Sequence, residues 1–321
     1  EILKEKNTKV RNILMMCFTS MLPNVSKMIP GDRKTVNGKS GWQISKLWVP
    51  GIHTEKNIFE SFKSRYKKIR KGKEETNKLI KSKTFKLFNK SSEYLKNIKS
   101  ESVDYIFTDP PYGESISYFG LSMFFNSWLQ SFVDYEKEII FDPYRDKRHD
   151  DYSNRLEKVF KELYRILKPG RHISFTFHNR DLIIWKGVID AVNDAGFEIR
   201  NIAYQEQAVL SGTQGINYKN TLKGDFVYTF IKPIIKRKNS ILKHKDPVQL
   251  INKKLDRIFK SSEFITSDKL FEEIIPFIIK KQIYKDRNGL PINIEKILNI
   301  NYDYGPVDAM DKIFAWKKKT V

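Results

Sequence analysis

The residues best placed to do chemistry are Asp109-Pro110-Pro111-Tyr112, which directly follow the apolar segment 103–108. That segment reads as a β-strand, and ligands of open α/β sheets bind beyond the carboxyl ends of the strands. Proline fixes φ and has no N–H, so two consecutive prolines make a rigid turn whose carbonyl oxygens can still accept hydrogen bonds. The motif predicts a rigid corner that presents a carboxylate, a main-chain acceptor and an aromatic ring.

Such a corner suits methyl transfer to an amino group that is conjugated with a ring. The lone pair of that nitrogen is delocalised, so the nitrogen is a poor nucleophile. If the Asp109 carboxylate and the Pro110 carbonyl each accept one N–H, the nitrogen is drawn towards tetrahedral geometry and its lone pair is aimed at the incoming methyl group. Tyr112 would offer a flat face for the ring, and a base in a duplex must be flipped out to reach it.

Residues 108–112, with 102–107 before them, resemble the catalytic motif of the amino-group DNA methyltransferases, which use S-adenosylmethionine to methylate adenine N6 or cytosine N4. Residues 163–173 are similar to the helix, turn and strand that follow the catalytic strand in these enzymes, and residues 47–57 resemble a segment of some larger bacterial DNA methylases. The resemblance covers about residues 45–232. It implies a Rossmann-like, doubly wound α/β sheet, S-adenosylmethionine as cofactor and DNA as partner.

The resemblance also implies roles for single residues. Asp109 and Pro110 would accept the target amino group, Pro111 would complete the turn, and Tyr112 would stack on the base. Because Asp-Pro-Pro-Tyr is commoner with adenine N6 and Ser-Pro-Pro-Tyr with cytosine N4, we expect adenine. The expected cofactor contacts are Asp109, Ser91, Ser115, Tyr118 and His178. For His178 a helix cap is an equal alternative, and Ser115 and Tyr118 could equally belong to a loop that packs on the next helix.

The chain departs from this family at the cofactor motif. The family binds its cofactor with a Gly-rich turn after the first strand, whereas this chain has no Gly-x-Gly, and Lys90-Ser91-Ser92 stand where an acidic contact is common. The order of elements indicates that the first two strands lie upstream of Glu1, which would leave one edge of the catalytic strand unpaired. We therefore expect a second polypeptide or an N-terminal segment to supply the cofactor-binding strands.

Hydrophobic spacing and turn residues predict alternating strands and helices from residue 84 onwards. The expected strands are 85–88, 103–108, 172–177, 197–207 and 225–231, the last two antiparallel around the Gly-rich loop 211–215. The expected helices are 9–28, 55–69, 92–98, 121–132, 153–167 and 182–195. The chain divides into a helical and loop segment (1–83), a catalytic core (84–235), and a basic linker with a mostly helical region (236–321), where Pro276 should kink or split a helix.

The charge of the chain indicates a polyanionic partner. Its 321 residues include 59 Lys and Arg against 38 Asp and Glu, a formal net charge of +21, with clusters at 63–73, 232–245 and 317–319. Basic side chains that neutralise phosphates release condensed counterions, which drives binding to nucleic acid. The codon bias of an AT-rich genome would produce a similar excess of lysine on a solvated surface.

The composition narrows the class of protein. Apolar residues make up 40% of the chain, as in globular proteins, and the single cysteine, expected in the core, excludes an intrachain disulfide. No apolar stretch reaches the ~18 residues of a membrane span. We expect a cytoplasmic, nucleoid-associated protein of a bacterium or archaeon that belongs to a restriction-modification system. An RNA methyltransferase acting on guanine N2 and a non-catalytic nucleic-acid binder remain as alternatives.

Overall fold

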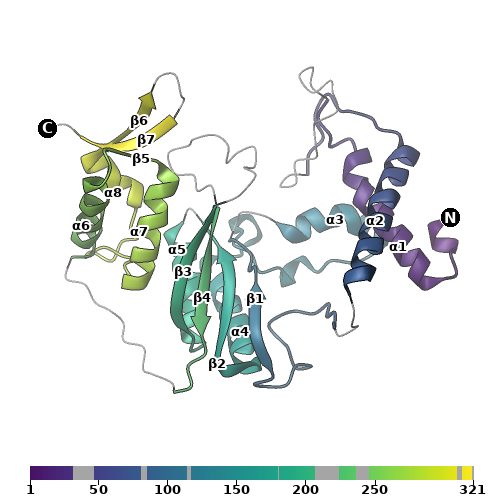
Figure 1. Cartoon of the computed structure of the whole chain (residues 1–321), viewed down its shortest axis with the longest axis horizontal. Coiled ribbons are helices and arrows are strands. Elements are labelled where there is room, and N and C mark those ends of the chain that lie inside the picture. Colours follow the sequence, from purple (N-terminus) through teal and green to yellow (C-terminus); the bar gives the residue numbers. More distant parts are fainter. Residues whose placement is uncertain are drawn as a thin grey trace. The chain divides into compact units, whose positions relative to one another are not determined.

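A computed structural model describes residues 1–31, 47–80, 85–113, 117–179, 181–206, 224–235, 246–308 and 313–319 (Figure 1). The chain forms two compact units. The first contains Glu1–Asn89 and Ile116–Glu138, and the second contains Lys90–Ser115 and Ile139–Val321. The proposed three-part division of the chain stays a prediction. None of the helices in the described ranges is long and apolar enough to cross a membrane.

The first unit is helical. After the short helix η1 (Ile2–Lys4) it contains α1 (Thr8–Val25), α2 (Ile58–Leu79) and α3 (Tyr118–Leu129), then η3 (Tyr135–Lys137). Asparagine side chains cap two of the helices: Asn7 accepts from the first-turn amides of α1, and Asn57 accepts from an amide of α2. The three long helices confirm the predicted helices 9–28, 55–69 and 121–132, although α2 extends ten residues further. Cys17 is buried in α1, as expected.

The second unit is built on a four-stranded mixed sheet. Its strands are β1 (Val103–Thr108), β2 (Leu167–Phe177), β3 (Glu198–Glu206) and β4 (Gly224–Ile231), in the order β1-β2-β4-β3. β1 and β2 are parallel, whereas β4 is antiparallel to both β2 and β3. The predicted α/β class and the antiparallel last pair are therefore confirmed. β2 begins five residues earlier than predicted, because Leu167 already pairs with Val103, with an irregularity in register before His172.

Two helices cover one face of this sheet. α4 (His149–Ile166) contacts β2 through the rings of Phe160 and Phe175, 5.5 Å apart between centroids. α5 (Leu182–Asp194) contacts the same face through Trp185, which lies edge-on to Phe226 of β4. The inward side chains of β2 and β4 on this face are all buried: Ile173, Phe175, Phe177, Phe226, Tyr228 and Phe230. This face is the hydrophobic core of the second unit.

The opposite face is open at β1. Tyr105 and Phe107 point to that face, since their register partners are His172 and Ser174, and they remain 55% and 62% exposed. β1 also stands at the end of the strand order, so among the described strands only β2 pairs with it. The unpaired edge expected for the catalytic strand is therefore found.

The C-terminal part of this unit differs from the prediction of a mostly helical region. It contains α6 (Pro247–Lys260), α7 (Ser267–Lys281) and α8 (Ile294–Asn301), but also β5 (Phe264–Ile265), β6 (Tyr302–Asp308) and β7 (Ile313–Lys318) in the order β5-β7-β6. β6 carries Pro306, which an edge strand tolerates. α7 runs through Pro276 as one helix, so of the predicted kink or split the split is wrong and the kink stays a prediction. Buried isoleucines on both sides of the proline hold that helix together.

Two further predictions are wrong. The strand 85–88 and the short helix 92–98 are irregular in the structure. Phe85 and Leu87 are 80% and 88% exposed, and an alternating apolar segment forms a strand only when a neighbouring strand satisfies its backbone. Ser91 to Ile98 form turns in place of a helix. The Gly-rich loop 211–215, the linker 236–245 and Ser115 lie outside the described residues.

Candidate active site

The Asp-Pro-Pro-Tyr corner lies where β1 ends. β1 and β2 run parallel, with Thr108 opposite Phe175, so Asp109 comes to lie beside Thr176 at the carboxyl ends of both strands. The Thr176 hydroxyl donates a hydrogen bond to Oδ1 of Asp109 at 2.6 Å. Asp109 itself is exposed. The predicted carboxylate is therefore held in place and still open to solvent.

Contacts from α4 and from the residues just after β2 fix the turn that follows. The hydroxyl of the buried Tyr152 donates to the Pro111 carbonyl, and the Asn179 side-chain amide donates to the Tyr112 carbonyl at 2.9 Å. Gly113 then adopts φ +69°, and a Cβ there would lie 2.8 Å from a side-chain carbon of Ile184. Glycine is thus required both by the backbone conformation and by the close packing.

Tyr112 is half-buried against the end of β2. Its ring lies edge-on to Phe177 and to His178, with centroids 5.2 Å and 5.3 Å away. Burial raises the pKa of its hydroxyl well above the ordinary value, and the charges of Asp225 and Asp109 raise this pKa further, whereas a hydrogen bond with Thr176 lowers it. The hydroxyl therefore stays protonated at neutral pH, within the same polar cluster as Asp109 and Thr176.

His178 lies at the same edge of the sheet, as predicted. Its Nδ1 contacts Oδ1 of Asp225 at the start of β4. His178 is not the cap of the following helix. Asp181 is the N-cap of α5, and its carboxylate accepts from the second amide of that helix. His178 is therefore tied to the sheet and to the Tyr112 ring.

The roles of the other predicted cofactor contacts stay predictions. Ser91 lies in a turn where its hydroxyl donates to the Glu93 carboxylate at 3.2 Å. Tyr118 begins α3 in the other unit, and Ser115 is outside the described residues. Among the predicted contacts, the second unit therefore brings only Asp109 and His178 to the same edge.

Sequence reasoning missed four residues that shape the site: Thr176, Tyr152, Asn179 as a donor to Tyr112, and Asp225. The parallel register could have pointed to Thr176, because a residue at the end of the neighbouring strand must flank Asp109. No sequence signal singled out Tyr152 or Asp225.

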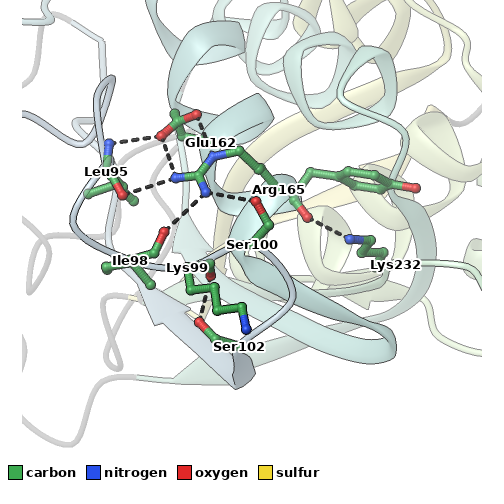
Figure 2. A network of polar contacts seen from close by, with 9 residues as sticks. Leu95, Ile98, Lys99, Ser100, Ser102, Glu162, Arg165 and Lys232 are labelled. Atoms are coloured by element: carbon green, nitrogen blue, oxygen red, sulfur yellow. Dashed lines mark hydrogen bonds and ion pairs between the residues drawn. The ribbon is translucent and has the colours of Figure 1, made fainter.

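A polar network holds the segment that leads into β1 (Figure 2). The Arg165 guanidinium, near the end of α4, pairs with Glu162 and donates to the carbonyls of Leu95 and Ile98 and to the Ser100 hydroxyl. Glu162 in turn accepts from the Leu95 amide at 2.8 Å. These contacts fix the backbone a few residues before β1. They therefore help to define the position of β1 and of Asp109, which follows it.

The arrangement can hold an amine. It presents a carboxylate and, one residue later, the Pro110 carbonyl, to which no hydrogen bond is made from the described part of the chain. Asp109 interacts with the Tyr112 hydroxyl, and Pro110 is buried at the same corner. Across the described ranges, no three His, Cys, Asp or Glu side chains gather as a metal site would require.

Comparison with solved structures finds distant similarity. TTHA0409 of Thermus thermophilus, a candidate DNA modification methylase, is 15% identical, covers 52% of this chain and 60% of its own, and gives a TM-score of 0.27. A complex of the same protein with S-adenosyl-L-methionine is 14% identical over the same shares, also with a TM-score of 0.27. A SAM-dependent methyltransferase of Methanosarcina mazei is 12% identical, covers 46% and 66%, and gives 0.25. The chain thus spans about three fifths of the length of the first of these.

No curated protein matches the chain. A sequence model of one family does: the DNA methylase family matches residues 103–269, which contain the Asp-Pro-Pro-Tyr corner, the four-stranded sheet and the helices that cover it. The matched segment is more than half of the chain, and this protein therefore belongs to the DNA methylase family.

Proposed function

We propose that this chain carries the part of an S-adenosylmethionine-dependent DNA methyltransferase that holds the target amine, and that the target is adenine N6. The observation that carries the proposal is the exposed Asp109 carboxylate, held by Thr176 at the carboxyl end of β1 and followed by the rigid Pro-Pro turn. Membership of the DNA methylase family supports DNA as the substrate.

In the proposed reaction, Asp109 and the Pro110 carbonyl each accept one N–H of the amino group. This orients the nitrogen lone pair and stabilises the positive charge that develops on the nitrogen during transfer. The Asp109 carboxylate can then take the proton that the nitrogen must lose. Tyr112 packs against the ring of a base that has been flipped out of the duplex. S-adenosylmethionine, when bound, supplies the methyl group.

Within the second unit, Asp109 and His178 of the predicted cofactor contacts meet at one edge of the sheet. We propose that a second polypeptide or an N-terminal segment supplies the remaining strands. Two observations support this: β1 has no described strand on its outer side, and its aromatic residues Tyr105 and Phe107 are exposed on the face away from α4 and α5. An unpaired, apolar edge is costly for a folded protein.

The test is methylation of plasmid DNA by the complete enzyme, with the products identified by nucleoside mass spectrometry. We expect N6-methyladenine with the wild type and none with Asp109→Ala, while the affinity of Asp109→Ala for DNA stays within about twofold because an exposed carboxylate adds little to phosphate binding. N4-methylcytosine would move the target to cytosine. Methylation of RNA but not of DNA would refute DNA as the substrate. If neither nucleic acid is methylated, the chain would be a nucleic-acid-binding protein without methyltransferase activity.

Calorimetric titration of the isolated 321-residue chain tests the partner. We expect S-adenosylmethionine to bind weakly to this chain and tightly once the missing strands are added. Tight binding to the chain alone would contradict the need for a second polypeptide or segment, and would leave the assignment of Asp109 intact.

A further inference from the structure

Thr176 faces Asp109 from the neighbouring strand and has none of the roles that were predicted from the sequence. We propose that Thr176 is a positioning residue, whose hydroxyl selects the side-chain rotamer in which Asp109 meets the target amine. This inference rests on the function proposed above and adds a residue to the same site. It is carried by the 2.6 Å hydrogen bond from the Thr176 hydroxyl to Asp109 Oδ1.

The strand geometry explains why this bond is well defined. Thr176 lies on β2, which is paired on both sides, with β1 and with β4. Its backbone is therefore fixed, and a β-branched side chain has few rotamers. The hydroxyl is accordingly a firm anchor, whereas Asp109 follows the last residue of an edge strand and is exposed. Without the anchor, an exposed aspartate samples several rotamers.

The bond is also of a strong kind. A hydroxyl that donates to a carboxylate makes a charge-assisted hydrogen bond, which is shorter and stronger than one between neutral groups. A threonine hydroxyl has one hydrogen, and in Thr176 that hydrogen is directed to Asp109. Tyr112 lies in the same polar cluster, where hydrogen bonds with Thr176 and with Asp109 shift the pKa of its hydroxyl in opposite directions. Thr176 thus links the carboxylate that holds the amine to the ring beside it.

Three variants separate positioning from structure. Thr176→Val keeps the shape of the side chain and removes the hydroxyl, and Thr176→Ser restores the hydroxyl. The matched control is Thr229→Val on β4, where the same change removes a hydrogen bond of 2.9 Å between Thr229 and Ser174 that does not reach Asp109. If the three variants keep the melting temperature of the wild type, differences in activity arise at the site.

In the isolated chain, the readout is the set of three-bond couplings between the Hα and Hβ atoms of Asp109, measured by NMR. We expect the couplings of a single rotamer in the wild type, in Thr176→Ser and in Thr229→Val, and averaged couplings in Thr176→Val. This measurement needs no cofactor and no methylation. Unchanged couplings in Thr176→Val would overturn the proposal.

In the complete enzyme, Thr176→Val should lower kcat by roughly 10- to 100-fold, the range for misplacing a reacting group. Its KM for DNA should change by less than about threefold, because the bond acts after binding. Thr176→Ser should recover most of kcat, and Thr229→Val should match the wild type. Equal losses in Thr229→Val would show a general effect on the sheet and refute positioning. If the wild type methylates no DNA but the Asp109 couplings still change in Thr176→Val, the proposed function is refuted and the positioning of Asp109 by Thr176 is not.

Discussion

The ion pair between Glu93 and Arg155 joins the segment before β1 to α4. Both side chains are largely buried, 8% and 14% exposed, and two hydrogen bonds connect them, the shorter one at 2.7 Å. The hydrogen bond from Arg155 holds the pKa of Glu93 below its ordinary value of 4.5, against the opposing effect of burial. A buried carboxylate whose pKa is lowered stabilises the folded state only while it is ionised.

The pH dependence of stability follows from that direction. The contribution of Glu93 is complete above pH 4.5 and is lost as the pH falls through the lowered pKa of the folded state. At pH 7, Glu93→Gln should reduce the free energy of unfolding by about 2 kcal/mol, since a hydrogen bond between charged groups becomes a weaker one. Urea titrations from pH 7 to pH 3 should show the difference between variant and wild type shrinking below pH 4.5. A difference that stays constant with pH would contradict the account.

At the scale of elements, Lys232 closes the C-terminal end of α4. The last carbonyls of a helix lack partners within the helix. Lys232 follows β4, and its ammonium donates to the carbonyls of Tyr164 and Leu167 at 3.0 and 2.8 Å, and to Glu101 at 3.1 Å. Figure 2 shows the ammonium beside the end of α4. Lys232 is only 5% exposed. It therefore ties the end of α4 to the segment entering β1, and a lysine assigned to a basic cluster proves to be structural.

Replacing this lysine should destabilise the sheet. Lys232→Met keeps the apolar stem but removes the donor to the buried Leu167 carbonyl and to the partly buried Tyr164 carbonyl. We therefore expect the free energy of unfolding to fall by about 2 kcal/mol. The control is Lys168→Met on β2, whose ammonium pairs with Asp104 in an exposed contact. Exposed pairs contribute little, so chemical denaturation should not distinguish this control from the wild type. A similar loss of stability in both variants would assign the effect to net charge instead.

Elements whose signals are local could be predicted from the sequence. β1, the corner at Asp109, and helices α4 and α5 follow from hydrophobic period and turn residues, and the structure has them at nearly those residues. The partners of the corner could not be predicted, because Thr176 and Tyr152 reach it through strand register and helix packing across 41 or more residues of chain. The predicted strand 85–88 is wrong because a local pattern is not sufficient. Its alternation is typical of a strand, but no described strand pairs with it.

At the scale of the whole molecule, the charge is unevenly distributed. α2 carries eight basic and three acidic residues and buries none of its side chains. By contrast, the C-terminal region is part of the core: Leu255, Ile275 and Trp316 belong to the same buried cluster as the residues of the four-stranded sheet. Deleting residues 236–321 would therefore expose this core. The contribution of each region to DNA binding has to be measured by neutralising exposed lysines instead.

We expect α2 to contribute more to DNA binding than the C-terminal region. The comparison uses two triple variants to glutamine, Lys67, Lys68 and Lys73 on α2 against Lys253, Lys260 and Lys317, all of which are exposed. The slope of log K against log salt falls by about 0.9 for each phosphate that the protein no longer neutralises. The α2 variant should therefore reduce the slope by between about 1 and 3 units, and the C-terminal variant by less than about 1. Because both variants remove the same formal charge, a general electrostatic effect would change the two slopes equally, and only localised binding of phosphates separates them. A larger reduction in the C-terminal variant would place the DNA backbone against α6 and β7.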